Sequence, residues 1–449
     1  MKQNIIGDVR PLPEFNKCGV NTLLGLDALG LHAVSQRHVK RGARSGAWQI
    51  RCHFLHLSGD CKKCGQHARI RNSWWRTFVH TPIAMNAVHL FVRFHRYEYQ
   101  DCGCLWSDDC SQIAPEGKKL THRAVWWAVA SVVLDARSVR SVAQTLYCSW
   151  GCANKTVLDT GLEYLIHDTH RLDGVTTIGV DEHVWRHTSK GDRYVTVIVD
   201  LTPRQHGKPA RLLDMVEGRS EKVFATWLEK QCQSFRDGIR VVAMDAFAGH
   251  KKAASRVVPH AVEVLGPFHI VALVGEKVTT VRCRLQQETT GRRGTKHDPL
   301  YRGRRALLKT AGLRTDRQQE RVDHLLAIES NAPLKLIHGV YQKIISCYKQ
   351  KDRKKGRGMM AELIESLAIP GAIKNCPELK TLGHTLKRRM KDILAFLDHQ
   401  YSANGPTEAI NGRLEHLRGI ALGFRTLNNY ITRSLQHAGG FKQTIHTKM

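Results

Sequence analysis

The feature that most constrains the fold of this chain is a series of short apolar segments between residues 175 and 270. Three of them, VTTIGVDEHVW, YVTVIVDLT and ARLLDMVEG, are rich in β-branched residues and follow one another directly, as strands do. Two more strand-like pieces, RVVAMD and AVEVLG, alternate with helix-like pieces. The segment therefore predicts an α/β domain built on a mixed five-stranded sheet with helices on its faces.

The rest of the chain divides into regions of different composition. Residues 1–115 are rich in Cys, His and basic residues and contain strand-like pieces such as HLFVRFHRYEY. Residues 120–172 have the pattern of helices, and residues 406–437 that of helix, turn, helix. We predict a third domain at 175–437 with a helical insertion at about 271–400. Within that insertion, the basic stretch KQKDRKKGRG is expected to be a solvated loop.

The charge of the chain points to a polyanionic partner. Lys and Arg number 69 against 40 Asp and Glu, which gives a net charge of +29. Such an excess favours nucleic acid, ahead of an anionic membrane or a merely solvated basic surface. The N-terminal MKQNIIGDVRPLPEF lacks the apolar core of a secretory signal, and AVWWAVASVVL falls short of the roughly 20 residues that cross a bilayer. We expect a cytoplasmic protein with DNA as partner, no membrane partner, and AVWWAVASVVL as a buried core helix.

A cluster of cysteines predicts a metal site in the N-terminal region. CKKCG at residues 61–65 has the spacing of a zinc knuckle, and YQDCGCLW could supply a second knuckle, although Tyr99 stands where a regular CxxC would have cysteine. The alternative is a knuckle that folds without metal. The predicted zinc ligands are Cys61, Cys64, Cys102 and Cys104.

The stretch SVRSVAQTLYCSWGCANKTVLDTG at residues 138–161 has the layout of a helix-turn-helix. Val139, Val142, Ala143 and Leu146 form one apolar face, Tyr147 to Ser149 can form the turn, and a second helix begins at Trp150. A plain structural helix pair is the alternative. If the second helix enters the major groove, the residues that reach DNA are Asn154, Lys155 and Thr156.

Three acids are candidates for metal-assisted chemistry. Asp181 ends the strand TTIGVD and Asp245 ends RVVAMD, which would place both at the rim of the sheet. Glu408 lies in the first turn of a helix in SANGPTEAINGR, on the same face as Asn411. Taken singly, the aspartates could be turn or capping residues, and Glu408 could simply favour the helix dipole. Together they suit two Mg²⁺ or Mn²⁺ ions that act in phosphoryl transfer.

The longer motifs resemble a known family, the DDE transposases of bacterial insertion sequences, and in particular the ISL-three group. The resemblance covers about residues 20–437, with departures at Tyr99 and at Gly266, where the group often has Asp. It implies a zinc-binding region, a helix-turn-helix and a ribonuclease H-like catalytic domain with Asp181, Asp245 and Glu408 as its triad. The motifs that carry it are IGVDE, VVAMDAFAGHKKA, GPFHIVALVGEKV, RLQQETTGRRGTKHDPLYRGRR and NGPTEAINGRLEHLRGIALGFRTLNNY.

The resemblance also implies a mechanism. The protein would bind the terminal inverted repeats of its element as a homo-oligomer on DNA, associated with the nucleoid. It would cleave the element end with water and join the freed 3′ hydroxyl to target DNA. Asn404 and Asn411 are expected to orient Glu408, while Glu182 and Asp200 are the nearest rivals for the triad positions. The alternatives are a nuclease without strand transfer and a DNA-binding regulator with an inactive catalytic domain.

Overall fold

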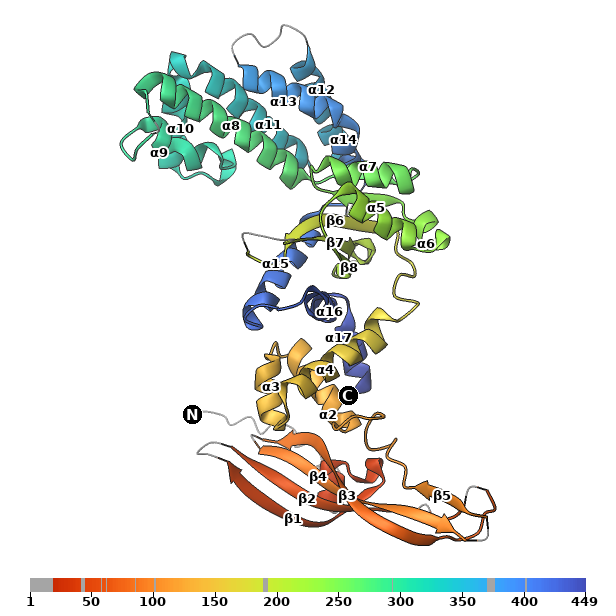
Figure 1. Cartoon of the computed structure of the whole chain (residues 1–449). Coiled ribbons are helices and arrows are strands. Elements are labelled where there is room, and N and C mark those ends of the chain that lie inside the picture. Colours follow the sequence, from red (N-terminus) through yellow and green to blue (C-terminus); the bar gives the residue numbers. More distant parts are fainter. Residues whose placement is uncertain are drawn as a thin grey trace, which may run out of the picture. The chain divides into compact units, whose positions relative to one another are not determined.

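The structure is a computed structural model, and it is described for residues 19–41, 45–57, 59–61, 63–84, 86–100, 102–188, 193–292, 294–369, 376–399 and 402–449. These residues form two compact units, which we call unit 1 and unit 2 (Figure 1). Unit 1 contains the described residues up to Thr160 together with 442–449, and unit 2 contains residues 161–441.

Unit 1 is built on a five-stranded sheet in the order β1-β2-β4-β3, with the short β5 paired to β4. All pairs are antiparallel except β2 with β4. One face carries a buried core that includes Ile50, Leu90 and Phe94, which is covered by Leu26, Leu29 and Ile113. The strand predicted in HLFVRFHRYEY is confirmed, but the size of the sheet was not predicted. The strands are β1 (Leu31–Arg41), β2 (Ser45–Phe54), β3 (Arg69–Ile83), β4 (Asn86–Tyr99) and β5 (Cys104–Ser107).

Three helices follow the sheet of unit 1. Thr121 caps the first helix by accepting a hydrogen bond from the amide of Ala124, and Ser138 caps the second in the same way. The second helix ends at Tyr147, whose φ of 52° turns the chain toward the third helix. The buried core helix and the helix pair thus occur where they were predicted. The helices are α2 (His122–Val133), α3 (Val139–Leu146) and α4 (Trp150–Gly161), with α1 (Val20–Leu24) before the sheet and α17 (Phe441–Lys448) at the chain end.

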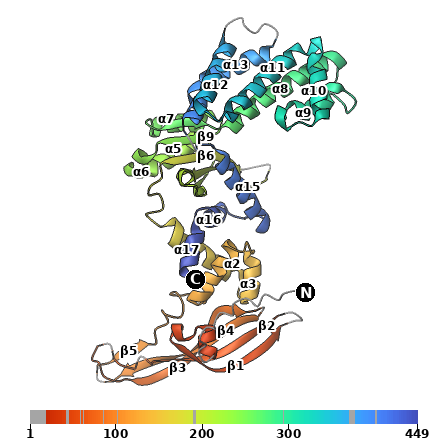
Figure 2. The same ribbon diagram turned by 180° about the vertical axis from the view of Figure 1, so that it is seen from behind.

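Unit 2 contains a second sheet, in the order β10-β9-β6-β7-β8. Strands β6, β7 and β8 pair antiparallel, while β9 pairs parallel to β6 and β10 parallel to β9, so the predicted mixed five-stranded sheet is confirmed. One face packs against α5 and α7 through Phe224, Trp227 and Ala253. Helices α15 and α16 contact β6, β7 and β8 (Figures 1 and 2). The elements are β6 (Thr177–Val184), β7 (Tyr194–Asp200), β8 (Arg211–Glu217), α5 (Glu221–Lys230), α6 (Gln233–Gly238), β9 (Val241–Met244), α7 (Ala248–Val257), β10 (Val262–Leu265), α15 (Gly405–Ile420) and α16 (Leu427–Ala438).

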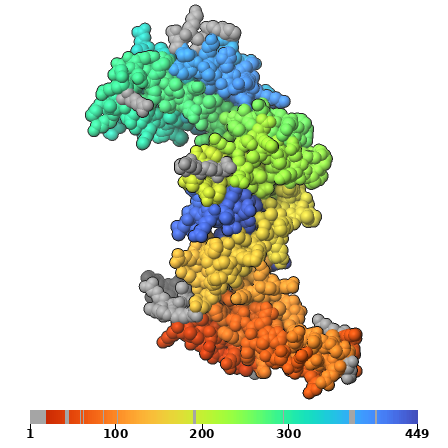
Figure 3. All heavy atoms as spheres, viewed as in Figure 1, coloured from red at the N-terminus to blue at the C-terminus, as the bar shows by residue number. Residues whose placement is uncertain are grey.

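The helical insertion lies between β10 and α15 and gathers at one end of unit 2 (Figure 3). Its helices share one apolar core that includes Val278, Ile344 and Leu382. It is tied to the sheet domain by Lys251 on α7, whose Nζ lies 2.8 and 2.7 Å from the carboxylate oxygens of Asp392 on α14. The helices are α8 (Pro267–Thr290), α9 (Pro299–Leu307), α10 (Asp316–Ala327), α11 (Ala332–Lys349), α12 (Arg353–Ala368), α13 (Pro377–Arg388) and α14 (Met390–Asp398).

The expectation that KQKDRKKGRG is a loop is wrong. Helix α12 already begins at Arg353, because Asp352 caps it by accepting hydrogen bonds from the amides of Lys354 at 2.9 Å and Lys355 at 3.2 Å. Only Gln350 to Asp352 connect the two helices. Among the described residues, no helix is both long and apolar enough to cross a membrane.

Candidate functional site: three acids at one edge of the second sheet

Parallel pairing between β6 and β9 brings Asp181 and Asp245 together. The last residues paired between these strands are Val180 and Met244, so each aspartate comes next on its own strand. The expectation that Asp181 ends its strand is wrong. Strand β6 continues to Val184, because it stays paired with β7 after β9 has ended. Asp181 is therefore held by a strand on one side and faces Asp245 at the end of a shorter strand on the other.

Helix α15 brings the third acid, Glu408, to the same place. Its first turn packs against β6 so closely that a Cβ atom added at Gly179 would lie 2.4 Å from Oγ1 of Thr407. The main-chain oxygen of Asn404 accepts hydrogen bonds from the amides of Thr407 at 2.9 Å and Glu408 at 3.2 Å, which fixes the start of the helix. Glycine at position 179 is thus what allows the helix to approach the strand.

The negative charges of the other two acids act on Asp181. Burial first, and then the negative charges of Asp245 and Glu408, raise the pKa of Asp181 to about 7, against the amide of Glu182. The pKa of Asp245 shifts the other way. Burial alone would raise it, but the hydrogen bond and charge of His250 and the amide of Phe247 hold it below its usual value. The edge of the sheet thus holds one acid that resists ionisation in the absence of a cation and one that is already stabilised as a carboxylate.

Two histidines that were not singled out in the sequence contact these acids. His250 on α7 is fully buried, and its Nδ1 donates to Oδ1 of Asp245 at 3.0 Å. His269 on α8 places Nε2 3.6 Å from Oε1 of Glu408. Both lie inside motifs that carry the family resemblance, VVAMDAFAGHKKA and GPFHIVALVGEKV, and that was the signal which could have found them.

The two asparagines act differently from the expectation. Asn411 donates from Nδ2 to Oδ2 of Asp181 at 3.0 Å, so it orients Asp181 and not Glu408. Neither side-chain atom of Asn404 has a hydrogen-bond partner. Several buried oxygens around the acids are also unpartnered, namely Oε1 of Glu408, Oγ1 of Thr407 and Oδ1 of both asparagines.

Unpartnered buried oxygens fit a hard cation, because Mg²⁺ and Mn²⁺ prefer carboxylate and carbonyl oxygen ligands. The spacing of the three acids is wider than that of a tight cluster. Within the described residues, the only set of three metal-binding side chains whose ligand atoms all lie within 4.8 Å of one another is Cys61, Cys64 and Cys102. The chemistry of the donors at the acid edge therefore fits divalent cations, although the three carboxylates stand further apart than the three thiols.

The two rival acids are engaged elsewhere. Glu182 lies next to Asp181 in the strand, and its carboxylate pairs with Arg219 at 3.3 Å. Asp200 is almost completely buried and pairs with Arg211 at 2.9 Å, while it also accepts the amide of Thr202. A buried carboxylate that already has an arginine partner has a structural role that explains its presence.

Three of the four predicted zinc ligands of unit 1 converge, whereas Cys104 lies outside the set whose ligand atoms are all within 4.8 Å of one another. Sγ of Cys102 lies 3.6 Å from that of Cys61 and 3.7 Å from that of Cys64, and Cys104 is hydrogen-bonded to Cys61. The CKKCG turn is tight, because the amide of Gly65 bonds to the main-chain oxygen of Cys61 and Gly65 has a φ of 72°. Burial alone would raise the pKa of Cys61, but the amides of Cys64 and Lys63 lower it to about 7. Three thiols held this closely, with one acidified, suit a soft divalent metal.

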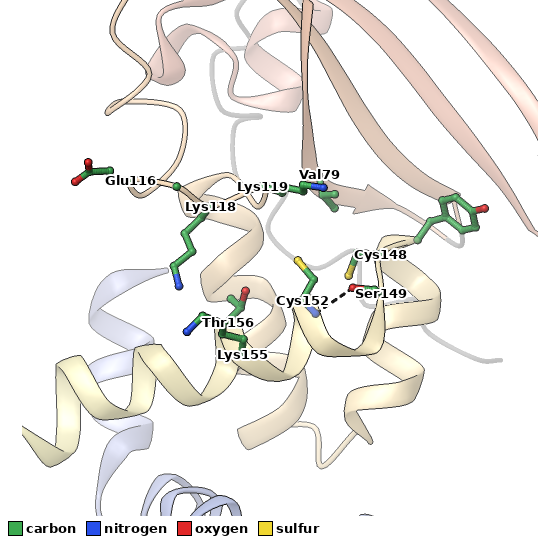
Figure 4. A pocket seen from close by; sticks show the side chains of 11 residues that line it. Val79, Glu116, Lys118, Lys119, Cys148, Ser149, Cys152, Lys155 and Thr156 are labelled. Carbon is green, nitrogen blue, oxygen red and sulfur yellow. Dashed lines mark hydrogen bonds between the residues drawn. The ribbon is translucent and has the colours of Figure 1, made fainter.

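Helix α4 borders a pocket of about 600 Å³ within unit 1 (Figure 4). Lys118, Lys119 and Lys155 line it, and so do Cys148 in the turn and Cys152 in the first turn of α4. Both Lys118 and Lys155 pair with Asp159 of α4. Of the three predicted DNA-contacting residues, Lys155 is exposed and Asn154 is half-buried, whereas Thr156 is buried against the pocket.

Comparison with known protein families gives the family of the chain. A family model described as transposase, DDE_Tnp_ISL3, matches residues 178–434, which is more than half of the chain and includes all three acids. No curated protein sequence matches the chain. The match shows that the protein is a transposase, and the mixed sheet of the matched segment is consistent with a transposase catalytic domain. The chain belongs to the ISL3 family of DDE transposases, so the resemblance found in the motifs is confirmed.

Proposed function

We propose that this protein binds the terminal inverted repeats of an insertion sequence and catalyses metal-dependent cleavage and strand transfer of DNA. The observation that carries the proposal is the meeting of Asp181, Asp245 and Glu408, from three distant segments, around unpartnered oxygens at one sheet edge. The strand order β10-β9-β6-β7-β8 supports a ribonuclease H-like catalytic domain. The function is phosphoryl transfer at a carboxylate site.

In this proposal the three acids hold two Mg²⁺ or Mn²⁺ ions. The ions would supply positive charge at the attacking and leaving oxygens of an in-line displacement. Asp181 must lose its proton to bind the ions. The hydrogen bond that Asn411 donates holds Oδ2 of Asp181 in place. His250 fixes the rotamer of Asp245, and α15 carries Glu408. Water attacks the phosphodiester at the element end, and the freed 3′ hydroxyl then attacks target DNA.

Unit 1 is proposed to bind DNA. The thiols of Cys61, Cys64, Cys102 and Cys104 would hold one zinc ion that fixes the ends of β3 and β4. Helices α3 and α4 would form the helix-turn-helix, with Lys155 and the pocket lysines placed for phosphate contacts. The division at 1–115, 120–172 and 175–437 remains a prediction, as does a homo-oligomer that pairs two element ends.

The test uses purified protein and DNA that carries an element end. We expect Glu408→Gln and Asp245→Asn to abolish cleavage and strand transfer in Mg²⁺ or Mn²⁺ while end binding in gel shifts persists. Glu182→Gln is the matched control, because it alters an acid next to the site that already pairs with an arginine. Normal cleavage by Glu408→Gln would refute the triad.

The same assay separates the alternatives. Strand transfer of the cleaved end into a target plasmid identifies a transposase. Cleavage without joining would favour a nuclease, and end binding with neither reaction would favour a DNA-binding regulator. Wild-type protein supplied with both Mg²⁺ and Mn²⁺ is the reference in each case.

A further inference from the structure

The sheet of unit 1 has a second face, opposite its apolar core. Strand pairing sets Arg37 across from Gln49, Arg51 across from Phe91, and Arg93 across from Trp75. Because side chains alternate across a strand, these residues share one face, whereas Ile50 and Leu90 point into the core on the other. We call this second face the outer face.

Both ends of the outer face along β4 are covered by other parts of unit 1. At one end, Nε2 of His89 lies 3.3 Å from the main-chain oxygen of Leu146, and its ring lies against Tyr147. At the other end, Trp106 stacks on Tyr97 at 5.6 Å. Between these ends lies an open area that we call the window. It consists of Ser35, Arg37, Gln49, Arg51, His53, Trp75, Thr77, Phe91 and Arg93.

The window combines positive charge with exposed aromatic surface. Three of its nine residues are arginines and none is an acid. The acid at the covered end, Asp108, is buried, and its carboxylate accepts bonds from His95 and Tyr97. Within the described part of the chain, none of the three arginines is paired with an acid, and such positive charge favours a polyanion.

Trp75 is the window residue that most directly indicates what the window binds. It is 47% exposed, and the guanidinium of Arg51 lies 5.9 Å from its ring centre. The ring of His53 is 6.0 Å from it on the same face. Beside it, Phe91 lines a hollow of about 290 Å³ together with Arg37 and Arg51. Aromatic rings set among arginines on an open sheet suit bases that stack and phosphates that pair.

We propose that the window binds an unpaired DNA strand, with a base stacked on Trp75 and phosphates on Arg51 and Arg93. A duplex hides its base faces and is read by elements that enter a groove, so an exposed ring on an open sheet fits a single strand better. The inference rests on the proposed function, because cleavage at an element end creates a strand end that can leave its partner. It adds a second DNA-binding surface to unit 1 besides α3 and α4.

The test exploits neighbours on opposite faces of the same strands. Trp75→Ala and Arg93→Glu alter the window, while Trp74→Ala and Arg96→Glu alter exposed residues on the other face of β3 and β4. Full-length proteins are titrated without divalent metal against one labelled mixed-sequence oligonucleotide, single-stranded and as a duplex. We expect the window variants to weaken single-strand binding roughly 5- to 150-fold. The affinity of the window variants for the duplex should change much less. The control variants should keep nearly wild-type affinity for both the single strand and the duplex.

Arg93→Glu should also reduce the salt dependence of single-strand binding, since a phosphate contact is lost. The inference would be overturned if the window variants kept wild-type affinity for the single strand. It would also be overturned if the window variants and the control variants lost the same affinity, or if the window variants lost affinity for the duplex alone. Circular dichroism checks that each variant is folded. The result is separable from the catalytic proposal, because Glu408→Gln tests cleavage and leaves every residue of the window in place.

Discussion

Asn411 on α15 donates a hydrogen bond to Asp181 on β6 over 3.0 Å. This hydrogen bond connects α15, the helix that carries Glu408, to the strand that carries Asp181. Asn411 follows Glu408 by three residues in that helix. The tie offsets some of the repulsion that the neighbouring carboxylates exert on Asp181, because it gives one of its oxygens a donor. The site is therefore held together, in the absence of a cation, by amide and histidine contacts.

Replacing Asp181 should stabilise the metal-free protein. The pKa of this carboxyl is raised in the fold to about 7 from 3.8, so the stability it contributes is present at low pH and is lost as pH rises from about 4 through 7. Asp181→Asn removes that loss, so its free energy of unfolding at pH 8 should exceed that of wild type by at most about 4 kcal/mol. We therefore expect a higher Tm than wild type at pH 8 and no difference near pH 4.

The same variant should lose its response to cations. Mg²⁺ or Mn²⁺ should raise the Tm of wild type and leave Asp181→Asn unchanged. Asp237→Asn, at an exposed acid of α6, is the control and should follow wild type in both measurements. A lower Tm for Asp181→Asn at pH 8 would contradict the electrostatic account of the site.

Gly179→Ala should separate the third acid from the other two. The added Cβ would lie 2.4 Å from Oγ1 of Thr407, so α15 must move away from β6, at a cost of about 1–3 kcal/mol. Cleavage of element ends should fall sharply while end binding stays. Gly358→Ala in α12 meets nothing within 4 Å and serves as the control. Adding Thr407→Ala, which removes the clashing oxygen, should restore part of the activity.

Metal analysis tests the cysteine cluster. We expect about one zinc ion per chain in wild type. Cys64→Ser and Cys102→Ser should each lose zinc, because each variant removes one thiolate ligand and the remaining thiolates hold the ion weakly. Chelation should lower the Tm of wild type and have no effect on these variants. Cys232→Ser alters an exposed thiol that bonds to Ser234 and should keep full zinc content. Zinc retained in both cluster variants would exclude this site.

His338 should make the helical insertion sensitive to acid. Burial, and then the charge of Arg314, lower the pKa of this imidazole to about 4, and the guanidinium donates to its Nε2 at 2.7 Å. Because the folded pKa is below the unfolded value of 6.5, protonation favours the unfolded chain. Stability is therefore lost as pH falls from about 6.5 to about 4, by up to about 1.4 kcal/mol per pH unit. His338→Gln should flatten the dependence of Tm on pH in that range, and an unchanged slope would refute this role.

The strands of the second sheet and its mixed character could be predicted from the order of the residues alone. Their short apolar runs, bounded by turn residues, favour strands over helices, and the runs between residues 175 and 270 form β6 to β10 in the structure. The sequence also indicated Asp181, Asp245 and Glu408 as candidate acids, because the first two were expected to end strands and the third to lie in the first turn of a helix. Most of the sheet of unit 1 was not predicted, because its strands lack the pattern by which strands are recognised. The first half of β3, RIRNSWW, is exposed throughout, so it shows no alternation between apolar and polar residues.

Which side chains contact one another in the site could not be predicted, because these contacts depend on strand register and helix docking. The register that sets Val180 beside Met244 depends on hydrogen bonds between strands 64 residues apart in the chain, which no local pattern encodes. The bonds of Asn411 to Asp181 and of His250 to Asp245 depend on where whole helices dock. Docking is set by packing, as the contact between Gly179 and Thr407 shows, and packing is a property of surfaces that form only after the elements have folded.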